Sequence, residues 1–392
     1  MRETGNDSLL ALNCGSSSIK FAVFSMDGTR SLKGLVEAIG HGQSPRLRVD
    51  GEPARSIGDE TSRHADLLPR LIADVILPAV RGSDAQGRIV GVGHRVVHGG
   101  DHFDAPVRID AAARREIAEL TPLAPGHQPH NLAGIDAAAA ALPDAPQVAC
   151  FDTAFHLTVP QVRREMALPR DYARQGLIRY GFHGLSYQHV AASLPDLGVA
   201  GQRVVACHLG NGSSICALQD GVSVWTSMGF TPLDGLMMGQ RPGRLDPGAV
   251  LWLLEHHQGD AAMVSKLLNH QSGLAGVSGI SGDMRTLLAS DAPDAQFAVS
   301  MYVDRLVEEI GAAAASLGGC DVVVFSGGIG ENSAPIRAMA LERLAWLGFA
   351  LDTQANEASS RKITRHDGQR HAFIIRADEE QVIADAVAGL VG

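Results

Sequence analysis

Residues 204–218 read VVACHLGNGSSICAL, and residues 9–24 read LLALNCGSSSIKFAVF. In each stretch an apolar run leads into a short turn of small polar residues, and a second apolar run follows. The pattern predicts two strands joined by a polar turn. An Asp-Gly pair then follows each second run, at residues 27–28 and 220–221, and predicts a hairpin into a third strand. The letters shared by the two stretches are few enough for chance, but the shared order of elements favours two domains of one duplicated plan.

Strands and helices alternate through most of the remaining chain. Further strands are predicted near residues 89–97, 147–151, 321–325 and 372–375. Helices are predicted near residues 60–80, 111–120, 131–142, 247–257 and 294–317, and from residues 333 and 378 onward. This alternation predicts the α/β fold class.

The composition narrows the class of protein. Hydrophobic residues make up 45% of the 392, which favours a folded protein with a large core. The net charge of −10 disfavours a nucleic-acid binder. The five cysteines form no C-x-x-C pair and are interpreted as buried reduced thiols of a cytosolic protein. The sequence contains no run of 18 apolar residues, so no membrane span is predicted. The polar N-terminus is unlike a signal peptide.

Glycine is more frequent than usual, since 44 of the 392 residues are glycine, which is about 11% against a usual share of about 7%. Residues 326–332 read SGGIGEN, between a predicted buried strand and a predicted helix, a context that suits an anionic ligand. The alternative is a tight structural turn. The spacing is not G-x-G-x-x-G, and no Walker A loop occurs, so if the protein uses ATP, it does not hold it in the P-loop manner. The two Gly/Ser turns offer donors to phosphate oxygens, although each taken alone is typical of a plain hairpin. Lys20 closes the first turn and is either a phosphate ligand or a solvated lysine.

Several charged residues stand in apolar surroundings. Arg95, in HRVVHGG, and Arg241, in MMGQRPG, suit the clamping of a carboxylate or a phosphoryl group, with a structural salt bridge as the alternative. Asp152 ends a predicted strand, and His183 stands between the glycines of RYGFHG, where a structural histidine is the alternative. Mg²⁺ needs only one or two protein oxygens besides phosphate. Asp152, together with an asparagine near the first turn and a glutamate near the C-terminus, offers such oxygens.

Taken together, these segments resemble the acetate kinase (acetokinase) family, within the larger group of acetate and sugar kinases, actin and heat-shock chaperone ATPases. The resemblance covers nearly the whole chain. It runs through NCGSSSIKF, GHRVVHGG, LAPGHQPHN, FDTAFHLTVP, RYGFHG, HLGNGSS, PLDGLMMGQRPGRLDP, SGDMR, GGIGEN and DEEQVIA. It implies a reversible, Mg²⁺-dependent phosphoryl transfer from ATP to acetate, which gives ADP and acetyl phosphate.

The resemblance also implies a role for individual residues. The metal residues correspond to Asn13 and Glu379, and the catalytic residues to Arg95, Asp152, His183 and Arg241. Arg95 is also expected to bind the carboxylate, Val97 to line the pocket for the methyl group, and His127 to contact the substrate. The nucleotide residues correspond to Lys20, His208, Leu209, Gly210, Asn211, Gly212, Asp283, Met284, Arg285, Gly327, Gly328, Ile329, Gly330 and Glu331. Asp152 is a proton-transfer residue in the family. Because a carboxylate substrate is already ionised, we expect it instead to orient a metal, a water or an arginine.

The fold implied is a pair of duplicated ribonuclease H-like domains, the actin-like ATPase fold, with a cleft between them. The implied first domain covers residues 1–152 together with a C-terminal helix at 380–392. The second covers 153–379 and is expected to bind the nucleotide and to dimerise. The implied protein is a cytoplasmic homodimer.

The chain departs from the family pattern at several positions. Leu185-Ser186-Tyr187 stands where Thr-Ser-His is common. Pro242 and Arg244 stand where a Ser or Cys and an acid are common, and Gly126 stands where Leu is usual. Two other functions stay open: a propionate or butyrate kinase of the same family, and a non-enzymatic actin-like ATPase module. An ATPase module has no small-acid clamp, so the two arginines argue against it.

Overall fold

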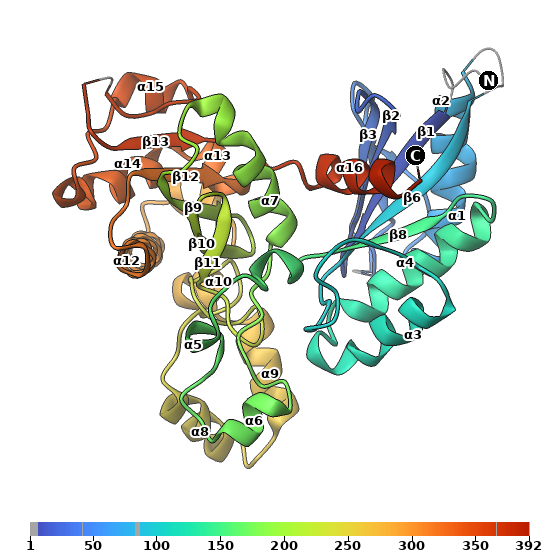
Figure 1. Cartoon of the computed structure of the whole chain (residues 1–392). Helices are drawn as coiled ribbons and strands as arrows, with labels where there is room; N and C mark the ends of the chain where they lie inside the picture. The colour runs from blue at the N-terminus through green and yellow to red at the C-terminus, as the bar shows by residue number, and fades with distance from the viewer. Residues whose placement is uncertain (1–6, 41, 83–86, 366, 392) are drawn as a thin grey trace. The chain divides into compact units, whose positions relative to one another are not determined.

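The computed structural model describes residues 7–40, 42–82, 87–365 and 367–391 (Figure 1). The chain divides into two compact units. The first consists of Met1–Ala154 with Asp378–Gly392, and the second is Phe155–Ala377. Each unit is built around one sheet that helices cover on both faces, which is the α/β class predicted from the sequence.

The first unit holds an eight-stranded sheet in the order β5-β4-β3-β2-β1-β6-β8-β7. Its strands are β1 (Asp7–Cys14), β2 (Ile19–Ser25), β3 (Arg30–Glu37), β4 (Arg46–Val49), β5 (Arg55–Ser56), β6 (Arg88–Val96), β7 (Val107–Arg108) and β8 (Gln147–Phe151). Its helices are α1 (His64–Leu71), α2 (Leu77–Arg81), α3 (Ala111–Glu119), α4 (Gln128–Ala141) and α16 (Glu379–Val391). A π-helical turn (Ile72–Ile76) joins α1 to α2, and a short 3-10 turn (Thr121–Leu123) follows α3.

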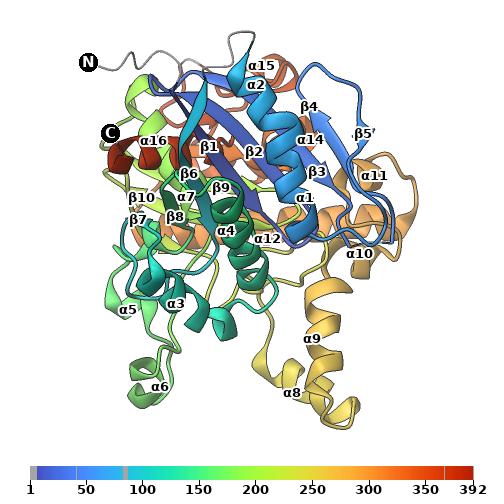
Figure 2. The same cartoon turned by 90° about the vertical axis from the view of Figure 1, so that its right-hand side faces the viewer.

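The central strand β1 explains why this sheet needs helices on both faces. Residues 9–14 are buried without interruption, so the strand has no solvated side. Helices α1 and α4 pack on one face, and α16 on the other (Figure 1, Figure 2). Gly91 and Gly93 on β6 let α16 approach closely, because a Cβ at Gly93 would lie 2.2 Å from a side-chain carbon of Ile383.

The second unit holds a five-stranded sheet in the order β11-β10-β9-β12-β13. Its strands are β9 (Arg203–Leu209), β10 (Ser213–Gln219), β11 (Val222–Thr226), β12 (Val322–Ser326) and β13 (His371–Ile374). Its helices are α5 (Gln161–Arg164), α6 (Arg170–Arg174), α7 (Gly184–Ser193), α8 (Pro247–His256), α9 (Ala261–His270), α10 (Gly273–Ser278), α11 (Met284–Leu288), α12 (Pro293–Leu317), α13 (Gly327–Asn332), α14 (Ala334–Arg343) and α15 (Thr353–Glu357). Short 3-10 turns lie at Ala154–His156, where the two units join, and at Pro195–Leu197 and Ala345–Leu347.

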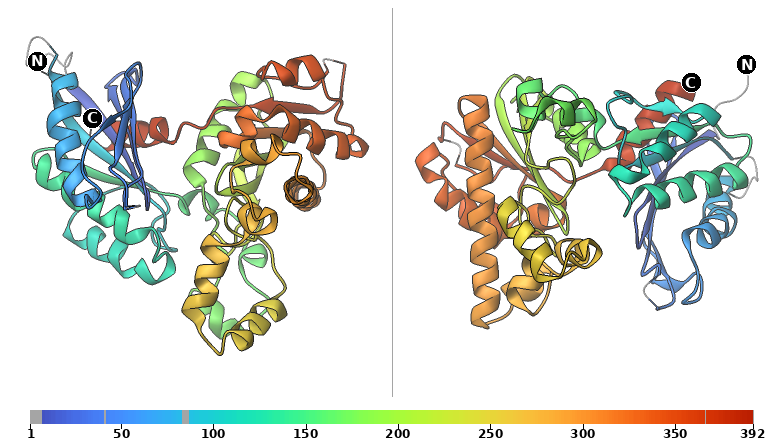
Figure 3. Two further views of the ribbon diagram at one scale, coloured as in Figure 1. Left: turned by 180° about the vertical axis from the view of Figure 1, so that it is seen from behind. Right: turned by 90° about the horizontal axis from the view of Figure 1, so that it is seen from below.

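The two sheets share one topology, which confirms the duplication inferred from the sequence. In the first unit β1 pairs antiparallel with β2 and parallel with β6, and β6 pairs parallel with β8. In the second unit β9, β10, β12 and β13 repeat these pairings in the same order. The long helix α12, seen along its length in the right-hand view of Figure 3, covers one face of the second sheet, and α7 covers the other.

The segment SGGIGEN differs from its prediction. The sequence predicts a glycine turn followed by a helix from residue 333, but α13 begins at Gly327, directly after β12, and α14 follows from Ala334. Glycine is a poor helix former, yet tertiary contacts override that preference. Here the Glu331 side chain accepts the amide of Gly327 over 2.9 Å and so closes the first turn.

The predicted state of the cysteines is confirmed, since all five are buried free thiols. Among the residues that the structure describes, no helix has the length and the apolar character needed to cross a membrane.

Candidate active site

Four polar side chains of the first unit meet where the parallel strands β1, β6 and β8 end. Asn13 lies near the end of β1, Arg95 near the end of β6, and Asp152 directly after β8. Glu379 is the first residue of α16, which packs on the same sheet. The carboxyl ends of neighbouring parallel strands share one edge of a sheet. The fold therefore brings together residues that lie up to 366 positions apart in the chain.

Arg95 is the hub of this cluster. Its Nη2 donates to Oδ2 of Asp152 over 2.5 Å and its Nε donates to Oδ1 over 3.0 Å, the two-point geometry that a guanidinium prefers with a carboxylate. Its Nη1 donates to Oδ1 of Asn13 over 3.2 Å. Asn13 in turn donates through Nδ2 to Oε2 of Glu379 over 3.1 Å. Asp152 is fully buried, so the cluster is fixed in the interior of its unit.

The charges of this cluster are unequal, with one cation facing two carboxylates. Burial by itself would lower the pKa of Arg95, but the carboxylates of Asp152 and Glu379 outweigh it, and the pKa is raised. Arg95 is therefore charged at every physiological pH. The neighbouring Glu380 points elsewhere, since its carboxylate lies 3.9 Å from Nζ of Lys33 on β3.

Two buried amides that sequence reasoning missed are hydrogen-bonded to the segments of the predicted substrate residues Val97 and His127. Val97 follows β6, and its amide donates to Oδ1 of Asn131 over 3.0 Å. Gln128 follows His127 at the start of α4, and its side chain donates to the carbonyl of His98 over 3.0 Å. Both amides lie in the segment LAPGHQPHN, whose match to the family was the only available signal.

Lys20 lies on β2 directly opposite Asn13 in the antiparallel register, so both side chains leave the same face of the sheet. Its side chain is exposed. The structure therefore places Lys20 beside the cluster of Asn13, Arg95, Asp152 and Glu379.

In the second unit, His183 adopts a backbone conformation that marks a constrained site. It precedes α7 with φ at +59°, in the left-handed region that costs a non-glycine residue about 1–3 kcal/mol. Its ring lies 4.3 Å from the ring of His208 on β9, centroid to centroid. Nδ1 of His183 is hydrogen-bonded to Oγ of Ser214 over 2.9 Å, and Nδ1 of His208 to Oγ of Ser186 over 2.8 Å. Two serines therefore fix two adjacent imidazoles.

A pocket of 790 Å³ in the second unit gathers seven of the fourteen predicted nucleotide residues. Its volume falls in the range of small-molecule sites, about 300–1,000 Å³. The predicted residues that line it are Gly210, Asn211, Asp283, Met284, Arg285, Gly328 and Ile329. They come from the turn after β9, the start of α11 and the start of α13, so three separate segments meet at one cavity.

The other predicted nucleotide residues of this unit lie behind or beside the pocket. Leu209 is fully buried in the core. Gly327 has φ at +76°, and a Cβ there would lie 2.7 Å from the Leu209 carbonyl, so no side chain fits. Gly330 is buried, and Glu331 accepts the amides of Gly327 and Ala377 through Oε1. These three residues of SGGIGEN therefore shape the turn. His208 and Gly212 lie next to the pocket, at the His183 ring.

The pocket also has lining residues that were not predicted, namely Gln240, Gly282, Leu288, Asn332, Ser333 and Pro335. Gln240 belongs to the loop that carries Arg241, and the amide of Gly239 in this loop donates to the carbonyl of Asn211 over 3.1 Å. A Cβ at Gly239 would lie 2.2 Å from Oδ1 of Asn211. Gly239, the first glycine of MMGQRPG, was therefore a usable sequence signal for this close approach of the loop to Asn211.

Arg241 is mostly buried, yet it differs from Arg95 in its partners. Its Nη1 donates to the carbonyl of Pro232 over 3.3 Å and lies 3.9 Å from the sulfur of Met238. No carboxylate within the described ranges forms an ion pair with it. Burial lowers the pKa of Arg241, and no acid offsets that effect. A desolvated cation of this kind is suited to an anionic ligand.

Arg244, one of the departures from the family pattern, has a structural partner. Its Nη2 is bonded to Oε1 of Glu309, a residue of α12 that is 3% exposed. Arg244 thus ties the loop of Arg241 to the long helix.

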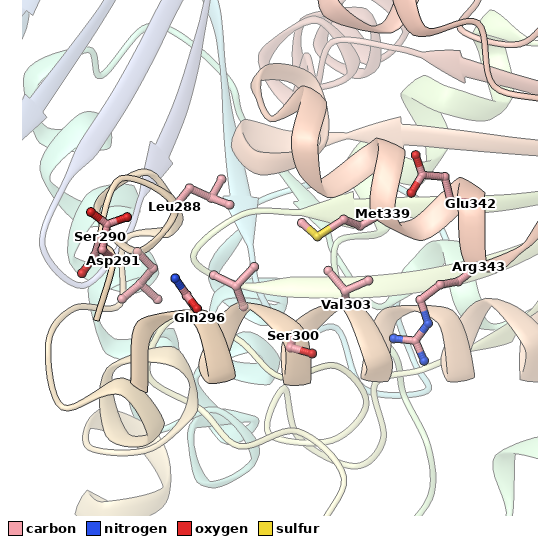
Figure 4. Close-up of a pocket in the computed structure, with 11 residues that line it drawn as sticks. Leu288, Ser290, Asp291, Gln296, Ser300, Val303, Met339, Glu342 and Arg343 are labelled. Atoms are coloured by element: carbon pink, nitrogen blue, oxygen red, sulfur yellow. The ribbon is translucent and has the colours of Figure 1, made fainter. Parts of the chain in front are cut away.

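A second pocket of 560 Å³ lies between α11, α12 and α14 (Figure 4). It has an apolar floor that includes Val303 and Met339 and a rim that includes Asp291, Glu342 and Arg343. Leu288 lines both pockets, so the short helix α11 separates them.

The nucleotide-sized pocket and the charged cluster both fit a kinase, and comparison with known proteins decides the family. The family model described as "Acetokinase family" matches residues 8–385. The chain belongs to the acetokinase family. The acetate kinase of Rhodopseudomonas palustris is 45% identical over 393 residues, with 97% of each chain covered. The acetate kinase of Rhizobium meliloti is 44% identical, with 98% of each chain covered.

Solved structures of the family agree with this assignment. The chain is similar to a propionate kinase from Francisella tularensis with a TM-score of 0.90 and 34% identity, covering 98% of this chain and 99% of that one. It is similar to the acetate kinase of Porphyromonas gingivalis with a TM-score of 0.87 and 34% identity, covering 98% and 100%. The family consists of kinases that use a carboxyl group as the phosphoryl acceptor, so the chain is a phosphotransferase of the actin-like ATPase fold.

Proposed function

We propose that this acetokinase family member catalyses the reversible transfer of the γ-phosphoryl group of ATP to acetate, giving ADP and acetyl phosphate. The single observation that carries the proposal is Arg241. It is a buried cation that has no carboxylate partner among the described residues, and it directly follows Gln240 of the nucleotide pocket. A kinase for a small acid needs such a cation, whereas a pure nucleotide-binding module does not.

The chemistry requires positioning more than proton removal. A carboxylic acid with a pKa near that of a glutamate, about 4.3, is ionised at neutral pH, so its oxygen attacks the γ-phosphorus without a general base. The bond between that phosphorus and the β,γ-bridging oxygen breaks, and ADP leaves. In this proposal Arg241 and His183 donate hydrogen bonds to the oxygens of the transferring group, where positive donors are most effective.

The residues of the first unit fit the binding of acid and metal. Asn13, Asp152 and Glu379 present side-chain oxygens in one cluster, and oxygen is the donor that Mg²⁺ prefers. When bound, Mg²⁺ would neutralise phosphate charge. Within the described ranges no group of three or more His, Cys, Asp or Glu side chains is placed to hold a metal alone. We therefore assign Asn13 and Glu379 as protein ligands that share the metal with nucleotide oxygens, with Asp152 orienting Arg95.

Propionate is the second candidate acceptor, because one of the similar solved structures is named a propionate kinase. One methylene in an apolar pocket changes the free energy of the transition state by only about 1–3 kcal/mol. Val97, which is 5% exposed, is the residue that we assign to the end of the acyl chain. Mixed use of short acids is consistent with such a pocket.

The decisive experiment measures ATP-dependent acyl phosphate, trapped with hydroxylamine, with acetate, propionate and butyrate as separate acceptors. We expect acetate to give the highest kcat/KM. A higher value for propionate would change the substrate and keep the reaction class. ADP release that is equal with and without any acid would instead identify an ATPase module and overturn the proposal.

The proposal includes the quaternary state and the compartment that the family implies, a cytoplasmic homodimer. Several large apolar side chains of the second unit are exposed, including Trp252 at 59% on α8 and Val162 at 85% on α5. Such side chains are suited to a subunit interface. Light scattering of the purified protein tests this, and a monomer at all concentrations would contradict it.

A further inference from the structure

A chain of three side chains leads from the core of the second unit to His183. The hydroxyl of Tyr187 on α7 lies 2.5 Å from Oγ of Ser214 on β10. Oγ of Ser214 lies 2.9 Å from Nδ1 of His183. Tyr187 is 1% exposed and Ser214 is fully buried, so water does not compete for either hydroxyl.

Each hydroxyl in these two hydrogen bonds has one proton, and this limit fixes which atom donates in each bond. Ser214 Oγ is the one side-chain hydrogen-bond partner of the Tyr187 hydroxyl among the described residues, so it accepts the tyrosine proton. Ser214 Oγ then has one proton of its own, and within the described residues its remaining partner is Nδ1 of His183. The opposite order would leave the buried proton of the tyrosine without an acceptor among the described residues, which is unfavourable. Nδ1 therefore accepts, and in the neutral ring the proton is on Nε2.

Nε2 of His183 faces the turn after β9. It lies 3.4 Å from the position that a Cβ on Gly212 would take, and this turn contributes Gly210 and Asn211 to the nucleotide pocket. A protonated Nε2 presents a donor to a phosphoryl oxygen, whereas a lone pair there would repel it. The absence of a side chain at Gly212 keeps this approach open.

We propose that Tyr187 is a positioning residue that acts through Ser214 to hold His183 as the neutral tautomer with its proton on Nε2. The inference rests on the proposed function, in which His183 donates to the transferring phosphoryl group. It also gives a role to Tyr187, one of the positions at which this chain departs from the family pattern. The neutral ring of His183 then presents a donor at Nε2 without carrying a charge.

Three titratable side chains contact Tyr187 within the described part of the second unit. Cys207 on β9 and Cys216 on β10 face Tyr187, and burial raises the pKa of both thiols, that of Cys216 to about 12. The His156 ring lies 5.7 Å from that of Tyr187, and burial lowers the pKa of His156 to about 4. Burial also raises the pKa of Tyr187 itself. At pH 8.5 these groups are therefore neutral, and the signals of the adjacent His208 must be separated from those of His183.

The test compares Tyr187→Phe and Ser214→Ala with the wild-type protein by ¹⁵N NMR of labelled histidine at pH 8.5, with the signals of His183 assigned from His183→Gln and those of His208 resolved in the same spectrum. We expect the wild type to show the Nε2–H form alone and both variants to show a mixture. Tyr302→Phe is the matched control, because Tyr302 is equally buried and its hydroxyl lies 3.4 Å from the adjacent Ser213. An unchanged tautomer in both relay variants would overturn the proposal.

The second readout is kcat for acetate-dependent ADP release at pH 8.5, with Tyr187→Phe made in the wild-type and in the His183→Gln background. In the wild-type background we expect Tyr187→Phe to lose about threefold to tenfold, less than the 10²–10³ typical of a deleted oxyanion donor, because the ring remains. In the His183→Gln background Tyr187→Phe should cause no further loss, because Tyr187 acts through His183. A further loss of the same size in that background would mean a structural role only and overturn the proposal. No acid-dependent activity in the wild type would remove the proposed function, while the NMR result would still decide whether the relay exists.

Discussion

The two units place different chemistry on the same strand ends. In the first unit the parallel strands β1, β6 and β8 end at Asn13, Arg95 and Asp152, which form a charged cluster. In the second unit the equivalent strand β9 ends at a glycine turn and β12 at the glycine-rich helix α13, and both segments line a pocket. The topology is shared, so the difference comes from the few residues that follow each strand. A fold supplies positions, and the side chains at those positions supply the chemistry.

The two predicted clamp arginines show this difference most clearly. Arg95 is held by Asp152 and Asn13 within its own unit, and its pKa is raised. Arg241 is held by a backbone carbonyl, and burial lowers its pKa. Removal of the first should therefore harm the fold, while removal of the second should harm the reaction.

Arg95→Ala carries the largest expected effect. It removes the guanidinium that pairs with Asp152 and Glu379, and loss of one partner of a buried pair costs about 3–5 kcal/mol. We expect the first unit to lose that much free energy of unfolding, measured by hydrogen exchange of peptides from β1 and β6. Arg88→Ala is the control, because Arg88 begins the same strand and its pair with Asp7 is exposed, so the change should stay within about 1 kcal/mol. Equal stability of the two variants would contradict the assigned role of Arg95.

Arg241→Ala is expected to lower kcat by about 10²–10³, the loss typical of a donor that stabilises transition-state charge. Its stability should be unchanged or slightly higher, because a desolvated cation is removed from the interior. All three tryptophans, Trp225, Trp252 and Trp346, lie in the second unit, so tryptophan fluorescence in urea reports on this unit alone. Arg305→Ala, on an exposed pair of α12, serves as the control. An unchanged kcat in Arg241→Ala would contradict the proposed role of Arg241 as a donor to the transferring phosphoryl group.

The units should also differ in acid sensitivity. Burial lowers the pKa of His94 and His98 in the first unit to about 4, and that of His156 in the second to about 4. The unfolded chain takes up these protons near the ordinary pKa of about 6.5, so each histidine removes stability as the pH falls from about 6.5 to 4, up to about 3 kcal/mol. We expect the first unit to lose about twice as much as the second.

Hydrogen exchange at pH 7.5 and 5.0, corrected for the intrinsic rate, measures this with peptides from β6 and β12. An equal loss in both units would contradict the assignment of the shift to these histidines.

Much of the fold could be predicted because its signals are local. The apolar run at 147–151 coincides with β8, and the repeated strand-turn-strand pattern gives the duplicated sheets. Helix α7 was not predicted, since residues 184–187 are buried in succession and leave no amphipathic period. The helical form of α13 was missed because glycine propensity argues against it.

The site was predictable in its residue types and not in its contacts. Sequence reasoning requires an anion for a buried Arg95, but only the sheet brings Asp152 to it, 57 residues away. Likewise, nothing near Asn13 indicates Glu379. The family resemblance supplied these residues, and the physical reason for the match is the common edge where parallel strands end. The link from Tyr187 through Ser214 has no sequence signal at all, because it joins a helix to a strand across a core.

The smallest expected effect tests the glycine turns directly. Gly327 is the first residue after β12, as Val97 is after β6. The structure therefore has room for a side chain at this position in the first unit and none in the second. With φ at +76° and the Leu209 carbonyl 2.7 Å from the position that a Cβ would take, Gly327→Ala should cost the second unit about 1–3 kcal/mol. Gly328→Ala is the matched control, since nothing lies within 4 Å of its Cβ position and alanine favours the helix. Tryptophan fluorescence in urea without nucleotide measures both variants. If Gly327→Ala proved as stable as Gly328→Ala, the backbone at Gly327 would be able to relax around a side chain. The lack of space for a side chain would then not distinguish the second unit from the first.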